Sequence, residues 1–217
     1  VHGVNGSVPG TVLDDTGAPI PGVTITAYLA PNGATGDRFT ADTATVGNDF
    51  ATLPNFPAEI RAPQGTIAGV SSFQLHFAGI EIKTPGDRPD VLVAMNPAAL
   101  RANLADLEPG GLIIADTHEF TPRNLAKVGY AADPLTDGSL SNYAVHAIDL
   151  TTQTVAAVSG YGLGRKEASR AKNMYALGLL TWLFTRPVES TLHFLDAKFS
   201  ARHDIRDPVG DGLFEPP

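Results

Sequence analysis

Two apolar runs joined by a short helical segment constrain the fold of this chain more than any other feature. Residues 91–95 are continuously apolar, which is typical of a strand buried on both faces of a sheet. Asn96 is placed to cap a helix with Pro97 at its first position, and residues 112–115 form a second apolar run. These segments predict a right-handed βαβ unit with parallel strands. One helical face should be formed by leucines spaced four and three apart, Leu100, Leu104 and Leu107.

Further strands and helices are expected around this unit. The patterns predict strands at 23–29, 50–53, 72–78, 80–83 and 144–150, and helices at 36–47, 121–127, 166–184 and from Pro187 onward. Residues 54–69, rich in proline and glycine, should form a long loop. A length of 217 residues allows one ordinary domain. We therefore predict a single α/β domain whose mostly parallel sheet carries helices on both faces.

The two ends of the chain differ from its centre. Residues 1–22 are rich in Gly, Val, Pro and Thr, and Asp14 and Asp15 are their only charges. Their pattern predicts a divergent leader that is either flexible or a hairpin. Residues 204–217 are expected to be unstructured, which leaves 23–203 as the main domain.

Composition excludes several classes of chemistry. The chain has no cysteine, so it supplies no thiolate zinc site, cysteine nucleophile or iron–sulfur ligand. Its net charge of −8 argues against nucleic-acid binding. No apolar run reaches the roughly 18 residues of a membrane span, and the first 35 residues lack the Lys or Arg of a signal peptide. These observations favour a soluble, cytoplasmic protein without membrane contact.

Standard catalytic motifs are absent from the sequence, and no catalytic residue is assigned. A run of alternating glycines at 160, 162 and 164 favours a helix-to-helix connection over a phosphate cradle. Asp116, His118 and Glu119 lie just past a predicted parallel strand, where ligands often bind. No second ligand set stands at metal spacing, so we interpret them as a solvated or helix-capping cluster.

Two other places offer polar groups for a ligand. Asn96 stands at a strand end, where capping its helix still allows ligand contact. Glu59 and Arg61 lie in the proline-bounded loop. They form a buried pair that orders the loop, or Arg61 clamps a carboxylate or phosphate. Spacing alone leaves both alternatives open.

Several ordered segments carry a family resemblance. They are 36–40, 53–63, 70–74, 93–100, 120–130 and 172–178. In order and at matching spacing over about residues 36–203, they resemble the gamma domain of 2-oxoacid:ferredoxin oxidoreductases. The likeness is strongest to the 2-oxoglutarate type, in which this domain begins the alpha subunit. The resemblance implies an α/β domain of an enzyme that is inactive alone.

The resemblance also implies cofactors, partners and contacts. The family decarboxylates a 2-oxoacid on thiamine diphosphate, passes electrons through an iron–sulfur cluster to ferredoxin and releases an acyl-CoA. Thiamine diphosphate and the cluster belong to the rest of the alpha subunit and to the beta subunit. The gamma domain is associated with coenzyme A. By carry-over from the family's motifs, the expected cofactor-binding residues are Glu59, Arg61, Asn96 and Asn173, and no metal ligand is implied.

Two departures from the family support a second hypothesis. The family's Gly-rich loop after the first strand is replaced here by residues 30–35, and no thiamine-binding region follows. A non-catalytic relic or a nucleotide- or CoA-binding module is therefore the alternative function. A third and weaker hypothesis is a secreted adhesive module led by an N-terminal hairpin.

Overall fold

The computed structural model describes residues 23–28, 49–55, 70, 72–78, 81–198 and 207. Several predicted segments lie outside the described residues: the leader at 1–22, the helix at 36–47, the loop from residue 56 to 69, and the tail at 204–217 apart from Asp207.

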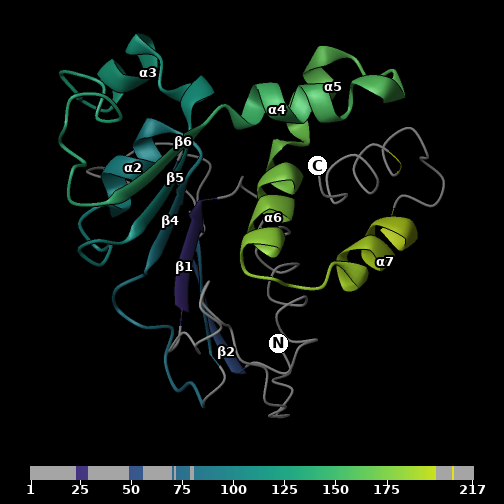
Figure 1. Cartoon of the computed structure of the whole chain (residues 1–217), viewed down its shortest axis with the longest axis horizontal. Coiled ribbons are helices and arrows are strands. Elements are labelled where there is room, and N and C mark those ends of the chain that lie inside the picture. The colour runs from purple at the N-terminus through teal and green to yellow at the C-terminus, as the bar shows by residue number, and fades with distance from the viewer. Residues whose placement is uncertain are drawn as a thin grey trace.

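A six-stranded sheet in the order β2-β3-β1-β4-β5-β6 forms the centre of the described structure (Figure 1). Its strands are β1 (Val23–Tyr28), β2 (Asp49–Asn55), β3 (Ser72–Ala78), β4 (Val91–Ala94), β5 (Leu112–Asp116) and β6 (Ala144–Ile148). β1, β4, β5 and β6 pair in parallel, whereas β3 is antiparallel to both β1 and β2. Among the described strands only β3 is reversed, which confirms the mostly parallel sheet.

The predicted connection between β4 and β5 is confirmed. Helix α2 (Pro97–Asn103) joins the two parallel strands, and the Asn96 side chain accepts a 2.9 Å hydrogen bond from the Ala99 backbone N–H. The helix is shorter than expected, because Leu104 is already its C-cap residue. Leu107 nevertheless packs in the core with 2% of its surface exposed. The apolar spacing thus predicted burial correctly but overestimated the length of the helix.

The turn into β5 requires a glycine at position 111. A β-carbon at Gly111 would lie 2.8 Å from the carbonyl oxygen of Glu108 and 2.9 Å from that of Asp90. These oxygens are held in place because they accept hydrogen bonds from Gly111 and Leu112. Only a residue without a side chain lets β5 start beside β4 at this register.

Helices cover both faces of the sheet (Figure 1). The core under α2 and α3 (Pro122–Lys127) is formed by Leu92, Ala94, Ala99, Leu100, Ile113, Ala115 and Leu125. The opposite core, against α4 (Leu150–Ala157) and α6 (Lys172–Leu183), is formed by Phe77, Val91, Val93, Ile114, Leu150, Leu177 and Leu180. Successive residues of β4 and β5 alternate between the two cores, so both faces are buried, as the continuous apolar runs predict. Burial of each large side chain contributes about 1.5–3 kcal/mol.

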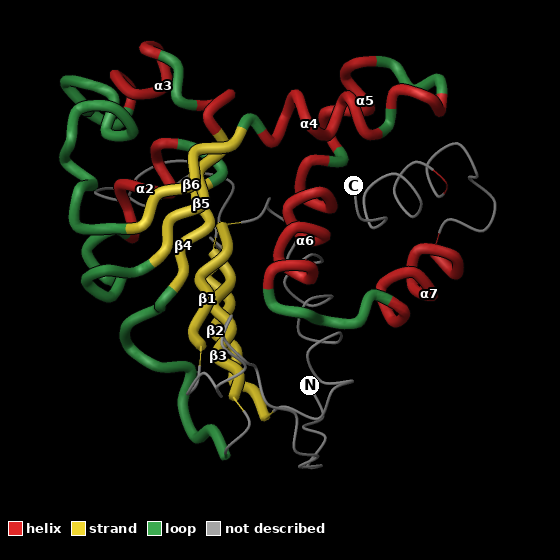
Figure 2. The backbone as a smooth tube through the Cα atoms, viewed as in Figure 1, coloured by secondary structure: helices red, strands yellow, loops and turns green. Residues whose placement is uncertain are grey.

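The chain after β6 is helical or connecting wherever it is described up to Lys198 (Figure 2). Helices α5 (Arg165–Arg170) and α7 (Glu189–Lys198) extend the layer that contains α4 and α6. A third small core ties this layer together and is formed by Val158, Ala168, Ala171 and Leu195. Within the described part of the chain, no helix combines the length and apolar character needed to cross a membrane.

Three sequence-based expectations about elements are wrong. Residues 81–83 form no strand, because β3 already pairs with β1 on one side and β2 on the other. The strand expected at 144–150 ends at Ile148, and an unpredicted helix, α4, starts at Leu150 because Asp149 caps it. The helix expected at 166–184 is two helices, α5 and α6, which are separated at Ala171.

Candidate functional site

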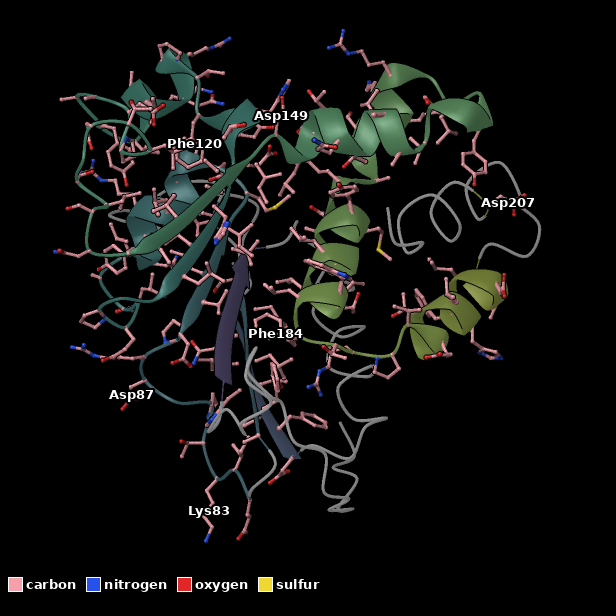
Figure 3. The ribbon with its side chains drawn as sticks, viewed as in Figure 1. Lys83, Asp87, Phe120, Asp149, Phe184 and Asp207 are labelled. Atoms are coloured by element: carbon pink, nitrogen blue, oxygen red, sulfur yellow. The ribbon has the colours of Figure 1, made fainter. Side chains whose placement is uncertain are left out.

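Polar side chains gather where the parallel strands end. Asn96 comes two residues after β4, Asp116 is the last residue of β5, and Asp149 directly follows β6. In Figure 3, Asp149 and Phe120 lie at one end of the sheet and Lys83 at the other. Carboxyl ends of parallel strands are the usual binding edge of open α/β sheets, so this edge is the candidate site.

Asp116 is fully buried at this edge, with 0% of its surface exposed. Its Oδ1 accepts a 3.3 Å bond from the backbone N–H of His118, which caps the short helix η1 (Thr117–Glu119). Its Oδ2 accepts a 3.1 Å bond from the Thr151 hydroxyl of α4. The interpretation of the 116–119 cluster as solvated or helix-capping is thus confirmed through the capping bond of Asp116.

Lys172 at the start of α6 supplies the opposite charge. Its Nζ lies 3.4 Å from Asp116 Oδ2 and 2.7 Å from Glu119 Oε1. The exposed fractions of the Lys172 and Glu119 side chains are 22% and 33%. A buried carboxylate needs both charge compensation and hydrogen bonds, and Asp116 receives them from three elements. We call Asp116, Glu119 and Lys172 the edge triad.

Asp149 and His118 form a more exposed pair beside the triad. His118 Nδ1 lies 3.6 Å from Asp149 Oδ1, with exposed side-chain fractions of 45% and 41%. The backbone N–H of Thr152 donates a 2.8 Å bond to Asp149 and is the main reason that the pKa of this carboxyl is lowered; partial burial opposes the shift. His118 makes a smaller contribution in the same direction.

The four site residues expected from the sequence have different outcomes. Glu59 and Arg61 lie outside the described residues. Asn96 is partly buried and uses its Oδ1 to cap α2; within the described structure, its Nδ2 group makes no hydrogen bond. Asn173 is also partly buried and follows Lys172 directly. Lys172 contacts Asp116 at the end of β5, and Asn96 follows β4, the strand that pairs with β5.

The glycines at 160, 162 and 164 connect helices, as predicted. They lie between α4 and α5, around the short helix η2 (Ser159–Tyr161). Gly162 takes a left-handed conformation with φ of 70°, which favours glycine. No strand leads into this run, so it lacks the context of a dinucleotide-binding turn.

Sequence reasoning missed Lys172 and Thr151 as members of this site. Lys172 is 56 positions and Thr151 is 35 positions from Asp116, so no local spacing connects them. A partial signal was available, because a carboxylate that ends a continuously apolar strand needs a partner from elsewhere in the chain.

The charges at this edge limit what it can bind. Its carboxylates Asp116, Glu119 and Asp149 face Lys172 and His118, so the edge is negative when His118 is neutral. This set does not suit a phosphate group, which needs cations or free backbone N–H groups. An amide side chain such as that of Asn96 suits uncharged polar groups. In the described structure, no group of three or more His, Asp or Glu side chains is arranged to hold a metal ion.

Comparison with known proteins agrees with this architecture. The family model for pyruvate ferredoxin/flavodoxin oxidoreductase matches residues 36–207. The 2-oxoglutarate oxidoreductase subunit KorA of Mycobacterium tuberculosis is 56% identical over 173 residues, which cover 80% of this chain and 26% of KorA. The chain thus spans about a quarter of the length of this relative.

Solved structures share the fold at low identity. A 2-oxoglutarate:ferredoxin oxidoreductase from Magnetococcus marinus, solved with 2-oxoglutarate, coenzyme A and succinyl-CoA bound, matches with a TM-score of 0.64 and 22% identity over 89% of this chain and 30% of that one. The gamma subunit of a keto/oxoacid ferredoxin oxidoreductase from Geobacter sulfurreducens matches at 0.52 and 16%, over 89% of this chain and 96% of that one. Subunit PORC of the pyruvate oxidoreductase of Thermotoga maritima matches at 0.53 and 16%, over 89% and 94%.

The extent of the family match and the identity to KorA go well beyond a shared fold. The family model covers most of the chain, including β4, β5, the edge triad and α6. The chain belongs to the pyruvate ferredoxin/flavodoxin oxidoreductase family.

Proposed function

We propose that this chain is the gamma domain of a 2-oxoacid:ferredoxin oxidoreductase of the 2-oxoglutarate type, and that it is inactive alone. The observation that carries the proposal is the 56% identity to KorA over 173 residues. The domain would occupy residues 23–203, preceded by the divergent leader and followed by the tail.

The reaction that the domain would support is a CoA-dependent oxidative decarboxylation. The bond between C1 and C2 of 2-oxoglutarate breaks and carbon dioxide leaves. The C2 carbonyl carbon then forms a thioester with the sulfur of coenzyme A, giving succinyl-CoA. Two electrons pass to ferredoxin, and the thiol proton is released. None of these 217 residues is a cysteine, so cysteine ligands of an iron–sulfur cluster would come from other parts of the complex.

The remaining components would be supplied by partners. Thiamine diphosphate would be bound by the rest of the alpha subunit and the beta subunit, and ferredoxin would dock on the assembled complex in the cytoplasm. The partial coverage of KorA supports this division, because three quarters of that relative lies outside the match.

Coenzyme A would contact this domain at two places. Asn96 and Asn173 would bind the uncharged pantetheine arm, since the neighbouring edge triad disfavours phosphate. Glu59 and Arg61 would serve the phosphate end, where Arg61 supplies a cation; at the described edge, Lys172 is already paired with two carboxylates. This assignment follows the family's motifs and the charge distribution at the edge.

Reconstitution tests the proposal. The chain is co-expressed with the missing alpha portion and the beta subunit, and reduction of ferredoxin is followed with 2-oxoglutarate and coenzyme A. We expect reduction that requires both substrates and all components. A complex that forms but never reduces ferredoxin with any 2-oxoacid would contradict the proposal.

Calorimetry of the chain with coenzyme A addresses the alternative function. Binding without turnover in any assembled complex would support a CoA-binding module. Absence of both binding and turnover would support a relic.

A further inference from the structure

The first turn of α6 lacks the usual means of fixing a helix start. Its N-cap residue is Ala171, which makes no side-chain capping bond, and no acidic residue occupies the first turn. The preceding helix α5 ends at Arg170, so α6 starts after a break of one residue. The start of α6 is therefore not fixed by a side-chain cap.

The residue that begins α6 is unfavourable for helix stability. Lys172 places a positive charge at the positive end of the helix macrodipole. Asp116, in turn, places a carboxylate with 0% exposure at the end of β5. Well-packed apolar residues in place of such a pair are often as stable or more stable. The pair is therefore better explained by the geometry it imposes than by stability.

That geometry fixes the segment of α6 that carries Asn173. Lys172 Nζ reaches Glu119 at 2.7 Å and Asp116 at 3.4 Å, which ties the start of α6 to the end of β5 and to η1. One residue later, α6 carries Asn173. Further along, Ala176 and Leu177 pack in the same core as Met95, which immediately precedes Asn96. The triad thus holds the start of α6 at the carboxyl edge, and the core holds its middle against the sheet.

We propose that Lys172 is the positioning residue of this site. Through Asp116 and Glu119 it sets the first turn of α6 against the carboxyl edge, and so holds Asn173 in register with Asn96 for contact with the pantetheine arm. This inference rests on the proposed function for its ligand, but the effect of Lys172 on the position of α6 does not depend on that ligand.

The test separates position from stability with four variants of the chain in the assembled complex. Lys172→Met removes the ammonium and leaves Asp116 uncompensated. The double variant Asp116→Asn with Lys172→Met removes both charges, so that no unpaired buried charge remains. Lys172→Arg keeps the charge, and Lys83→Met changes an exposed lysine at the opposite end of the sheet.

Two measurements are made on each variant. Steady-state ferredoxin reduction gives KM for coenzyme A and kcat, and amide hydrogen exchange reports the first turn of α6 and η1. We expect KM for coenzyme A to rise about 10- to 100-fold in Lys172→Met and in the double variant, with a smaller change in kcat. Exchange should accelerate at residues 173–176 even in the double variant, whose melting temperature recovers. Lys172→Arg should restore most of both properties, and Lys83→Met should change neither.

Recovery of KM together with melting temperature in the double variant would overturn the inference, because Lys172 would then matter only for stability. Unchanged amide exchange at residues 173–176 in Lys172→Met and in the double variant would also overturn the inference, whether or not the complex turns over. An assembled complex without CoA-dependent activity would instead refute the proposed function, while the exchange result still decides the positioning role.

Discussion

Asp116 ends β5, Asp149 directly follows the neighbouring parallel strand β6, and both make the same three kinds of contact. Each accepts a backbone N–H at a helix start, from His118 at 3.3 Å and from Thr152 at 2.8 Å. Each accepts a threonine hydroxyl, from Thr151 at 3.1 Å and from Thr152 at 2.7 Å. Each also faces a basic side chain, at 3.4 Å and 3.6 Å.

The two carboxylates differ in their access to water. The Asp116 side chain has no exposed surface, whereas 41% of the Asp149 side chain is exposed. The interior of a protein strengthens electrostatic interactions and makes an unpaired charge costly, whereas water screens both effects. The same kinds of contact at the ends of β5 and β6 should therefore differ several-fold in energy.

Removing the basic partner should show the largest difference. Lys172→Met should lower the free energy of unfolding by about 3 kcal/mol, because a buried carboxylate loses its counter-charge. The equivalent change beside Asp149, His118→Gln, should cost less than about 0.5 kcal/mol because that pair is exposed. Denaturant unfolding at neutral pH measures both values. Equal losses of unfolding free energy in the two variants would contradict the expected effect of burial.

Removing the hydroxyl donor should give the next effect. Thr151→Val should cost about 1.5 kcal/mol, since a buried ionised acceptor loses a hydrogen bond. Thr152→Val, one residue along the same helix, should cost about 0.5 kcal/mol because water replaces the lost bond. A larger loss for Thr152 than for Thr151, in the same unfolding assay, would contradict the ranking by burial.

Removing the cap of α4 should have a moderate effect that depends on the substituting residue. Asp149→Ala should lower stability by about 1 kcal/mol, whereas Asp149→Asn should cost only a few tenths because asparagine caps equally well. Thermal unfolding with circular dichroism detects the difference as a lower melting temperature for the Ala variant. If both variants melt together, capping by Asp149 contributes little.

Titration should show the smallest effect. The pKa of Asp149 is lowered in the folded protein, chiefly by the Thr152 N–H bond. The stability that this carboxylate contributes is therefore present above the unfolded pKa of about 3.9. It is lost as pH falls through the lower folded value. Asp149→Asn should flatten the decline of unfolding free energy below about pH 4, and an unchanged slope would argue against the contribution.

Much of the fold could be predicted because its signals are local. Apolar runs at residues 91–95 and 112–115 gave both central strands, and Asn96 and Pro97 gave the helix start. The helical half of the chain was harder to predict. Residues 172–183 are apolar on most sides, so periodicity does not reveal the break at Ala171. Periodicity also did not reveal the helix that starts at Leu150.

The candidate site could be predicted only in part. Its place at the carboxyl edge and Asn96 follow from strand order and capping, and Asn173 was expected from family motifs. The environment of Asp116 did not follow, because its partners Thr151 and Lys172 come from α4 and α6. Contacts between residues this far apart in sequence depend on how the helices pack.

By itself, the sequence determined the central strands β4 and β5, the Asn96 cap, the parallel core and the family, because apolar patterns and capping residues act within a few positions. Only the tertiary structure decided that Asp116 is buried while Asp149 stays accessible, and that Lys172 joins β5 to α6. The reason is that burial and charge pairing are properties of packed elements. Two similar carboxylates acquire different roles once α4 and α6 are packed against the sheet.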